Sequence, residues 1–320
     1  MSNNLNLTHD EHLRWSLIGR TVDGYRQTRY FQNRENDTEQ FKFRVGQISP
    51  NPGSWAQELD RATQLLISDH GTKLALFYSG GSDSELVLRS LIKQGIVPEV
   101  HVIRFCDRLN EHEVTNAFTV CEELGITPVV WDHDVMHYVR SEGYKELALK
   151  YQCSQIAYLT VLEYARRLDT PVIMGGEIYL QKHQQHAGGL VHAPTAWYYI
   201  YREDEDGVTY RYSYDTGHPI INEFFTYTPE LLYTWLAHPS ISRIARDEEP
   251  GKITLLSIKR GVYEQEIGYK LRAQSKFHGY EALTWVNVAV QRKLREQLPK
   301  ARVCRYEYNQ LVNDLCTPLY

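Results

Sequence analysis

The chain has 320 residues, of which 42% are hydrophobic and 23% are charged, and its 35 basic and 40 acidic side chains give a formal net charge of −5. This composition is typical of a globular protein of about two domains and does not support a uniformly basic nucleic-acid coat. No run of about 18 apolar residues occurs and the first residues lack a signal-peptide pattern, so we expect a protein that neither crosses a membrane nor is secreted. The five cysteines are widely spaced, which favours a reducing cytoplasm over a disulfide framework.

Residues 1–54 form a polar N-terminal extension in which only the alternating segment 41–45 predicts a strand. Proline and glycine between residues 50 and 53 break the chain. Ser54 then has the character of an N-cap, and apolar residues at helical spacing predict a helix that ends before Gly71.

From residue 73 onward, short apolar runs alternate with amphipathic helical patterns. The predicted strands are 74–78, 99–105, 128–131 and 171–174. The predicted helices between them are 85–94, 110–124 and 154–168. This rhythm predicts an α/β fold with a doubly wound, mainly parallel sheet, and we assign residues 55–190 to that domain.

The rhythm is lost in residues 191–320, which we expect to form a C-terminal substrate or lid lobe. Asp206-Gly207 lies between two tyrosine-rich segments, 197–202 and 208–214, and predicts a β-hairpin. The rest of the lobe is expected to be mainly helical, with helices over 229–238, 253–269 and 280–298.

The segment that carries the chemistry lies between the first strand and the first helix of the predicted sheet. It reads Ser79-Gly80-Gly81-Ser82-Asp83-Ser84. Two adjacent glycines let the backbone approach phosphate oxygens, the helix start offers free N–H groups, and three hydroxyls can donate further hydrogen bonds. Asp83 fits beside phosphates if Mg2+ lies between them, and since no lysine follows the glycines, the loop is not a Walker A motif.

This strand, loop and helix resemble the SGGxDS loop of the N-type ATP pyrophosphatase superfamily. In pattern the chain is most similar to the synthetase domain of asparagine synthetase and to 7-cyano-7-deazaguanine synthase-like enzymes. The resemblance covers the segment 55–190 and implies an adenine nucleotide alpha hydrolase-like fold with ATP and Mg2+ as cofactors. A simple Ser/Gly-rich turn without a ligand is the alternative.

The resemblance further implies an AMP-forming ligase. A substrate oxygen attacks the α-phosphorus of ATP, pyrophosphate leaves, and a nitrogen nucleophile then displaces AMP. Two alternatives stay open, a PAPS-reductase-like or sulfur-transferring enzyme and a non-catalytic nucleotide-binding module. The substrate is expected to be an unidentified small molecule or nucleobase; nucleic acid is not supported by the net charge, and a homo-oligomer is left open.

The resemblance also suggests residues around the loop. Ile103 and Phe105, at the end of the second strand, are expected to line the adenine pocket, with a buried strand end as the alternative. Gly175 and Gly176, after the fourth strand, would let the backbone approach ATP, and Glu177 would hold Mg2+ or the substrate amine. A tight turn is the alternative for the two glycines.

Cations are needed to stabilise the leaving pyrophosphate, and the loop itself provides none. A basic segment that begins at Lys259-Arg260 and continues through residues 270–276 could supply them. We predict Lys276 first and Arg272 second as catalytic residues beside Asp83, and a solvated helix face is the alternative.

Two further groups of polar residues come after strands. Asp134 is expected to cap a helix, with substrate contact by residues 132–137 as the alternative. A sulfur-transferring enzyme would need Cys106 and Cys153, and we interpret Cys106 as a buried structural cysteine.

Overall fold

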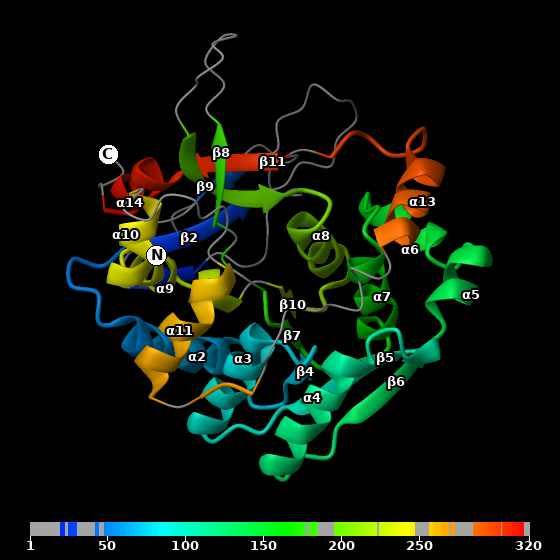
Figure 1. Cartoon of the computed structure of the whole chain (residues 1–320), viewed down its shortest axis with the longest axis horizontal. Coiled ribbons are helices and arrows are strands. Elements are labelled where there is room, and N and C mark those ends of the chain that lie inside the picture. Colours follow the sequence, from blue (N-terminus) through cyan, green and yellow to red (C-terminus); the bar gives the residue numbers. More distant parts are fainter. Residues whose placement is uncertain are drawn as a thin grey trace.

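The computed structural model describes residues 48–176, 178, 180–184, 195–222, 224–246, 256–268, 270–272, 284–301 and 303–316, together with strand segments 20–22, 25–30 and 42–44. Within them, helices surround a central sheet, and a smaller sheet lies at one end of the molecule (Figure 1). None of the described helices has the length and apolar character that a bilayer span requires.

The central sheet has five parallel strands in the order β10-β7-β4-β5-β6. Their bounds are β4 (Ala75–Phe77), β5 (Glu99–Phe105), β6 (Val129–His133), β7 (Val172–Met174) and β10 (Ile220–Ile221). The four strands predicted between residues 74 and 174 are confirmed. The fifth, β10, comes from beyond the expected domain end at residue 190, because two residues are too short a run to recognise as a strand.

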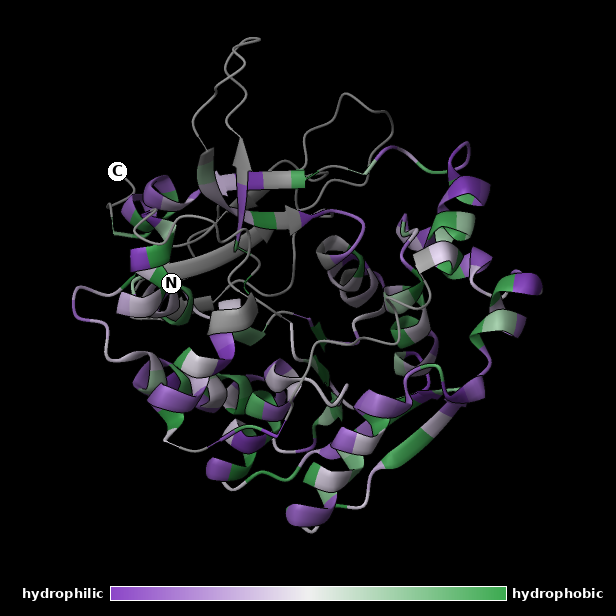
Figure 2. Ribbon diagram, viewed as in Figure 1, coloured by the Kyte–Doolittle hydropathy of each residue, from purple (hydrophilic) through white to green (hydrophobic). Residues whose placement is uncertain are grey.

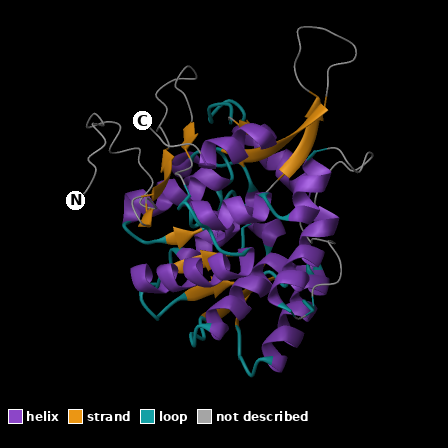
Figure 3. Cartoon of the chain, turned by 90° about the vertical axis from the view of Figure 1, so that its left-hand side faces the viewer, coloured by secondary structure: helices purple, strands orange, loops and turns teal. Residues whose placement is uncertain are grey.

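Side chains of the central strands alternate between two cores, as the period of a β-strand requires. Leu76 and Ile173 pack into the core below one face, whereas Ala75, Phe77 and Val172 pack into the core below the other. Hydrophobic residues gather on these strands and on the helix faces turned toward them, with helices on both sides (Figures 2 and 3). The predicted doubly wound arrangement is therefore confirmed.

The two faces are covered by different helices. On one face lie α2 (Trp55–His70), α3 (Ser82–Lys93) and α4 (Glu111–Glu123). On the other lie α5 (Val135–Arg140), α6 (Lys145–Tyr151), α7 (Ile156–Ala165), α8 (Asp206–Thr216) and α13 (Thr284–Leu294).

The predicted start of α2 is confirmed. Ser54 Oγ accepts from the Gln57 N–H, and Gln57 Oε1 accepts from the Ser54 N–H at 2.8 Å, which makes a capping box. Each group satisfies a backbone N–H that the helix would otherwise leave unpaired. Gly71, at a φ of 81°, ends the helix.

The remaining elements are mainly helical, as expected. They comprise the helices α9 (Pro229–Leu236), α10 (Pro239–Ala245), α11 (Leu256–Ile267) and α14 (Tyr308–Cys316), and the short 3-10 helices η1 (Cys106–Arg108) and η2 (Phe224–Thr226). An antiparallel sheet has the order β11-β9-β8, from β8 (Leu180–Gln184), β9 (Thr195–Arg202) and β11 (Val303–Glu307). A third sheet joins β1 (Arg20–Val22), β2 (Tyr25–Tyr30) and β3 (Lys42–Arg44), of which β3 falls in the strand predicted at 41–45.

The β-hairpin predicted around Asp206-Gly207 is wrong. The first tyrosine-rich segment is a strand, β9, but it pairs with β8 and β11, and the second segment is the helix α8. Val208 and Tyr212, four residues apart, bury their side chains together in the core below α7. This helical burial outweighs the turn preference of Asp-Gly.

A pair of Leu→Ala substitutions tests the central core. Leu76→Ala removes a fully buried side chain from β4 and should lower the free energy of unfolding by about 2–5 kcal/mol. Leu149→Ala makes the same chemical change at a side chain that is 39% exposed and should cost well under 1 kcal/mol. Urea denaturation measures both; equal losses would place Leu76 outside a packed core.

Candidate active site

The loop Ser79–Ser84 lies where the order of the central sheet reverses. From β4 the chain proceeds to β5 and β6 on one side, and then crosses to β7 on the other side of β4. The carboxyl ends of β4 and β7 therefore diverge into separate connections, which leaves a crevice between them. In open α/β sheets this switch point is where ligands bind.

Gly80 makes the turn from β4 into α3. Its φ of +80° is a conformation that side chains disfavour, and a Cβ there would collide with the backbone carbonyl of Glu113 and lie 3.2 Å from Ala117 N. The side chain of Asn116 donates a hydrogen bond to the Gly80 carbonyl. The turn is thus packed directly on α4, which fixes the direction in which α3 begins.

The first turn of α3 faces the crevice with its backbone N–H groups uncapped. Gly81 is the N-cap and makes no side-chain hydrogen bond to the helix. The hydroxyls of Ser79 and Ser84 lie 3.0 Å apart, and Ser79 Oγ accepts from the Gly81 N–H at 3.3 Å. The helix dipole and the unsatisfied N–H groups together make this end of α3 attractive to an anion.

A cavity of about 320 Å3 opens beside the loop. Eight of the ten residues expected to bind the nucleotide line it, namely Ser79, Gly81, Asp83, Ser84, Ile103, Phe105, Gly175 and Gly176. The other two, Gly80 and Ser82, belong to the same turn but do not face the cavity. The three sequence segments that the resemblance singled out therefore meet at one place.

Packing against α3, and not only the approach of a ligand, requires a glycine at position 175. A Cβ on it would lie 2.9 Å from the Ser84 backbone nitrogen and 3.1 Å from Ser84 Cα. The end of β7 is consequently pressed against the first turn of α3. Gly176, with a φ of +63°, completes the turn that both the functional and the simpler interpretation expected.

Asp83 is held by two side chains of α11. Lys259 Nζ donates to Asp83 Oδ2 at 2.5 Å, and the Tyr263 hydroxyl donates to Oδ1 at 2.9 Å. Lys259 is buried, with 4% of its surface exposed. A buried ammonium must be compensated by charge, and here the loop carboxylate supplies it.

Aromatic stacking fixes α11 in this position. The rings of Tyr263, Trp55 and Phe225 form a cluster in which each pair is stacked. The centroid of Tyr263 lies 5.1 Å from that of Trp55 and 5.5 Å from that of Phe225, and the latter two lie 6.4 Å apart. All three side chains are buried. Such stacked rings are rigid and bury a large apolar surface, so the core itself directs Lys259 toward the loop.

The expected magnesium site finds limited support. Both carboxylate oxygens of Asp83 already accept hydrogen bonds, and Glu177 lies outside the described residues. The described parts of the chain bring together no group of three His, Cys, Asp or Glu side chains that could hold a metal. In this arrangement Asp83 pairs with an ammonium, and each of its oxygens keeps one lone pair with which it could also bind Mg2+.

Of the two predicted catalytic cations, the structure describes only Arg272. Arg272 is not brought to the cavity, because its guanidinium pairs with Glu123 and its backbone N–H donates to Glu85 at 2.8 Å. Lys276 lies outside the described residues. Lys259 belongs to the same basic segment but was not singled out, since nothing in the sequence distinguishes it from solvated lysines nearby.

Sequence reasoning also missed Asn222. It follows β10, is 2% exposed and lines the cavity, and its Nδ2 has no hydrogen-bond partner among the described residues. An unpaired buried amide is costly, so an amide facing a cavity is well placed to donate to a ligand. Only recognition of β10 as a strand could have placed Asn222 at the sheet edge.

The polar residues at the end of β6 and directly after it have structural contacts. Asp134 caps α5 by accepting from the His137 N–H at 2.8 Å, as expected. His133 is buried against Tyr164, whose hydroxyl lies 2.9 Å from His133 Nδ1. Asp132 pairs with the exposed Arg104 at 2.6 Å, which turns that arginine away from the cavity.

Cys106 is exposed, so its interpretation as a buried structural cysteine is wrong. It opens η1, where the chain leaves the sheet and the side chain is no longer covered. Cys153 is the buried one, and burial raises the pKa of its thiol.

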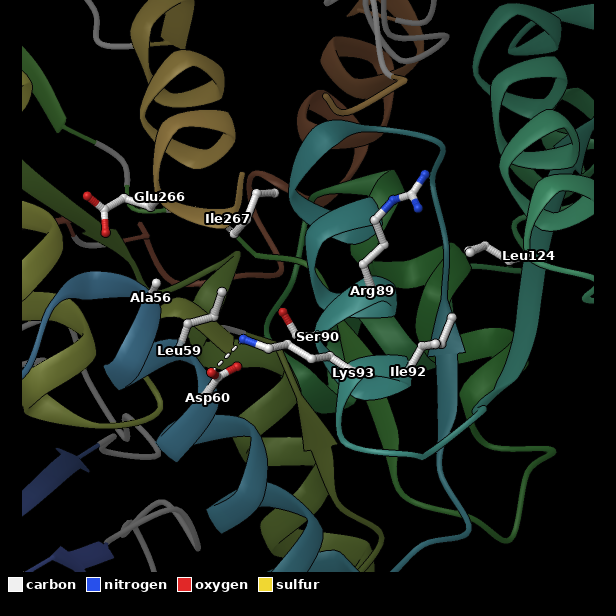
Figure 4. A pocket seen from close by; sticks show the side chains of 10 residues that line it. All are labelled: Ala56, Leu59, Asp60, Arg89, Ser90, Ile92, Lys93, Leu124, Glu266 and Ile267. Carbon is white, nitrogen blue, oxygen red and sulfur yellow. Dashed lines mark hydrogen bonds and ion pairs between the residues drawn. The ribbon is translucent and has the colours of Figure 1, made fainter. Parts of the chain in front are cut away.

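A second cavity, of about 430 Å3, lies between α2, α3 and the end of α11. Figure 4 shows that it opens near the C-terminal end of α3, where Lys93 reaches across to Asp60 at a distance of 2.6 Å. It is thus at the opposite end of α3 from the loop and shares no residue with the cavity there.

No protein-family model and no curated protein matches the chain. Among solved structures, it is similar to a predicted subunit of tRNA methyltransferase from Methanocaldococcus jannaschii, at 15% identity and a TM-score of 0.31, covering 64% of this chain and 93% of that one. It is also similar to NMN synthetase from Francisella tularensis, at 13% identity and a TM-score of 0.32, covering 76% and 94% of the two chains. Superpositions this loose assign neither ligand nor reaction.

Two Gly→Ala substitutions separate backbone strain from collision at the loop. Gly71 and Gly80 share a φ near +80°, but a Cβ on Gly71 meets open space. Gly71→Ala should cost about 1–3 kcal/mol of unfolding free energy, because its ψ of −172° at this φ is a conformation nearly restricted to glycine. Gly80→Ala should cost at least about 2 kcal/mol more, because backbone must move. Thermal denaturation compares them, and equal costs would contradict the tight packing of the loop on α4.

His133 should make stability depend on pH. Burial lowers the pKa of His133 to about 4 from an ordinary value of 6.5. Between these two pH values, His133 is protonated in the unfolded chain but neutral in the folded chain. The free energy of unfolding therefore has its full value above pH 6.5 and falls as the pH drops toward 4, by up to about 3 kcal/mol. Urea titrations of the wild type and His133→Asn measure this slope. A variant with an equally steep decline would refute the assignment.

Proposed function

We propose that this chain is an ATP-dependent, AMP-forming ligase in which the loop Ser79–Ser84 binds the β- and γ-phosphates of ATP. The observation that carries the proposal is the uncapped first turn of α3 at the reversal point of the sheet, with the buried Lys259 beside it. Backbone N–H groups, a helix dipole and one ammonium together suit a triphosphate.

Lys259 is the described cation best placed to stabilise pyrophosphate as it leaves. Its Nζ lies 2.5 Å from an oxygen of Asp83, within the loop that would hold the phosphates. Charge that builds up on the β-phosphate during attack at the α-phosphorus is then met by a fixed ammonium, which lowers the barrier without reorganisation. Lys276 stays a prediction for the same task.

The apolar part of the cavity suits a base. On the α7 side of the sheet, this part of the cavity is lined by Phe77, Ile103, Phe105, Tyr158 and Met174. A ring placed there would lie beyond the ends of β4 and β5, with its phosphates directed toward α3. Asn222 would then face the ribose or the substrate.

Asp83 acts in this proposal by holding Lys259 and Tyr263 in place. Mg2+ would neutralise phosphate charge where it binds, but the described residues present no vacant ligand set, so we assign no step to it. The acceptor of the adenylyl group is a substrate oxygen, and a nitrogen nucleophile then displaces AMP.

Nothing observed favours the sulfur-transferring alternative. Such enzymes need a reactive thiolate, and thiolates form where the pKa is lowered. Burial and neighbouring carboxylates raise the pKa of Cys106, and burial raises that of Cys153. Pyrophosphate release that survives Cys106→Ala, as we expect, would separate the ligase from that class.

Substitution of Lys259 tests the assigned role. Lys259→Met keeps the length of the side chain but removes its charge, and should slow pyrophosphate release at least 100-fold while weakening ATP binding much less, because the charge it meets develops during the reaction. Lys293→Met, on the exposed face of α13, is the matched control and should behave as wild type. Calorimetry measures ATP affinity, and an assay of pyrophosphate release measures the rate. If affinity and rate fell by the same factor, Lys259 would contribute to binding of ATP and not to the reaction step.

The reaction itself is tested with radiolabelled ATP and a metabolite extract. The ligase should form an AMP-bearing compound, and the sum of this compound and free AMP should equal the pyrophosphate released. ATP binding with no pyrophosphate under any mixture would instead identify a non-catalytic nucleotide-binding module.

A further inference from the structure

On the side of β4, the end of β5 has a backbone edge that none of the described strands covers. The last hydrogen bond between β4 and β5 joins the Tyr78 N–H, as donor, to the His101 carbonyl at 2.8 Å. Beyond His101, β5 continues past the end of β4. Alternate residues of a parallel strand direct their polar groups to the same side. The backbone groups of Ile103 and Phe105 therefore point beyond the end of β4, toward the cavity that both residues line.

The side chain of Asn110 occupies this edge. Its Oδ1 accepts from the Phe105 N–H at 2.8 Å, and its Nδ2 donates to the Ile103 carbonyl at 2.8 Å. Asn110 is 8% exposed and itself lines the cavity. One planar carboxamide thus satisfies an acceptor and a donor side by side.

The donor and acceptor of that carboxamide also occur side by side on the edges of bases, and their order differs between two classes of base. In an amide, a donor nitrogen and an acceptor oxygen share one carbon. In adenine the amino group and N1 share C6 in the same way, and in cytosine the amino group and N3 share C4. Guanine has the acceptor on the exocyclic O6 and the donor at ring N1, so these groups come in the reverse order. A guanine whose sugar is directed as that of adenine would therefore set its acceptor against the Ile103 carbonyl and its donor against the Phe105 N–H.

The chain that carries Asn110 is strained. Asp107 and Arg108, between the end of β5 and Asn110, have φ values of 60° and 59°, which non-glycine residues seldom adopt in succession. Strain of this kind persists where the surroundings enforce it and is often associated with segments that change conformation. Loss of the two hydrogen bonds of Asn110 would allow this short segment to relax.

We propose that the carboxamide of Asn110 occupies the base-reading edge of the cavity, and that an adenine displaces it to bind the Ile103 carbonyl and the Phe105 N–H. This inference rests on the proposed ATP site and adds to it a side chain that competes with the base. Because the competent state is only part of the population, Asn110 lowers the apparent affinity for ATP without altering which base fits.

Calorimetric titration of Asn110→Ala with ATP, CTP and GTP tests the competition. Removing the carboxamide should raise the affinity for ATP about five- to tenfold, since two modest hydrogen bonds no longer have to be broken. The affinity for CTP should rise by a similar factor, and the affinity for GTP should not change. Asn309→Ala, which removes an exposed carboxamide from α14, is the matched control and should leave all three affinities as in the wild type.

An uncharged second variant, Asn110→Ser, keeps the experiment decisive if the alanine variant does not fold. Its hydroxyl is too short to bridge both backbone groups, and ATP should bind to it more tightly than to the wild type. In Asn110→Asp, the carboxylate cannot donate to the Ile103 carbonyl, but it accepts more strongly from the Phe105 N–H and brings a negative charge, so ATP should bind less tightly than to the alanine variant. ATP binding that is unchanged or weaker in the folded alanine and serine variants would overturn the role of Asn110 while leaving the ATP site intact. Absence of ATP binding to every protein, wild type included, would overturn the proposed function and this inference together.

Discussion

The close packing of the turn after β4 is the constraint on which the candidate site depends. Gly80 passes beneath the backbone of α4, and Gly175 brings the end of β7 against the first turn of α3. With backbone pressed on backbone at both points, α3 can begin in only one direction. Its N–H groups then face the crevice where the sheet order reverses, so the geometry that would bind an anion is set by packing.

A second layer of the site comes from much later in the chain. Asp83 and Lys259 are 176 residues apart, yet they form a nearly buried ion pair. The pair exists because Tyr263, one helical turn beyond Lys259, is stacked against both Trp55 and Phe225. Core packing in one part of the molecule thus sets the electrostatics of a loop in another, and Asp83 compensates an ammonium that would otherwise be costly to bury.

Much of the central fold could be predicted because its signals are local. The strands at β4, β5, β6 and β7 are apolar runs bounded by Gly or Pro, and Ser54 has an N-cap pattern that needs no tertiary information. The helix at α8 could not be predicted, because the burial of Val208 and Tyr212 against α7 outweighs a strong turn signal. The strand β10 is too short to have a period at all.

The candidate site divides along the same line. Ser79–Ser84, Ile103, Phe105, Gly175 and Gly176 could be found because a motif and the ends of strands locate them. Lys259, Asn110 and Asn222 could not, because each acts through a contact between distant elements or a side chain bonded to backbone. Arg272 shows the converse: helical spacing favoured it, but its partner is Glu123.

The central claim is that the turn Ser79–Ser84 holds the tail of a triphosphate. A crystal structure with a non-hydrolysable ATP analogue and Mg2+ tests it most directly. The account predicts phosphate oxygens within hydrogen-bonding distance of the backbone nitrogens at the start of α3 and of Lys259 Nζ, with the base beside Phe105. Nucleotide bound elsewhere with this turn empty, at a concentration that saturates the protein in solution, would contradict it.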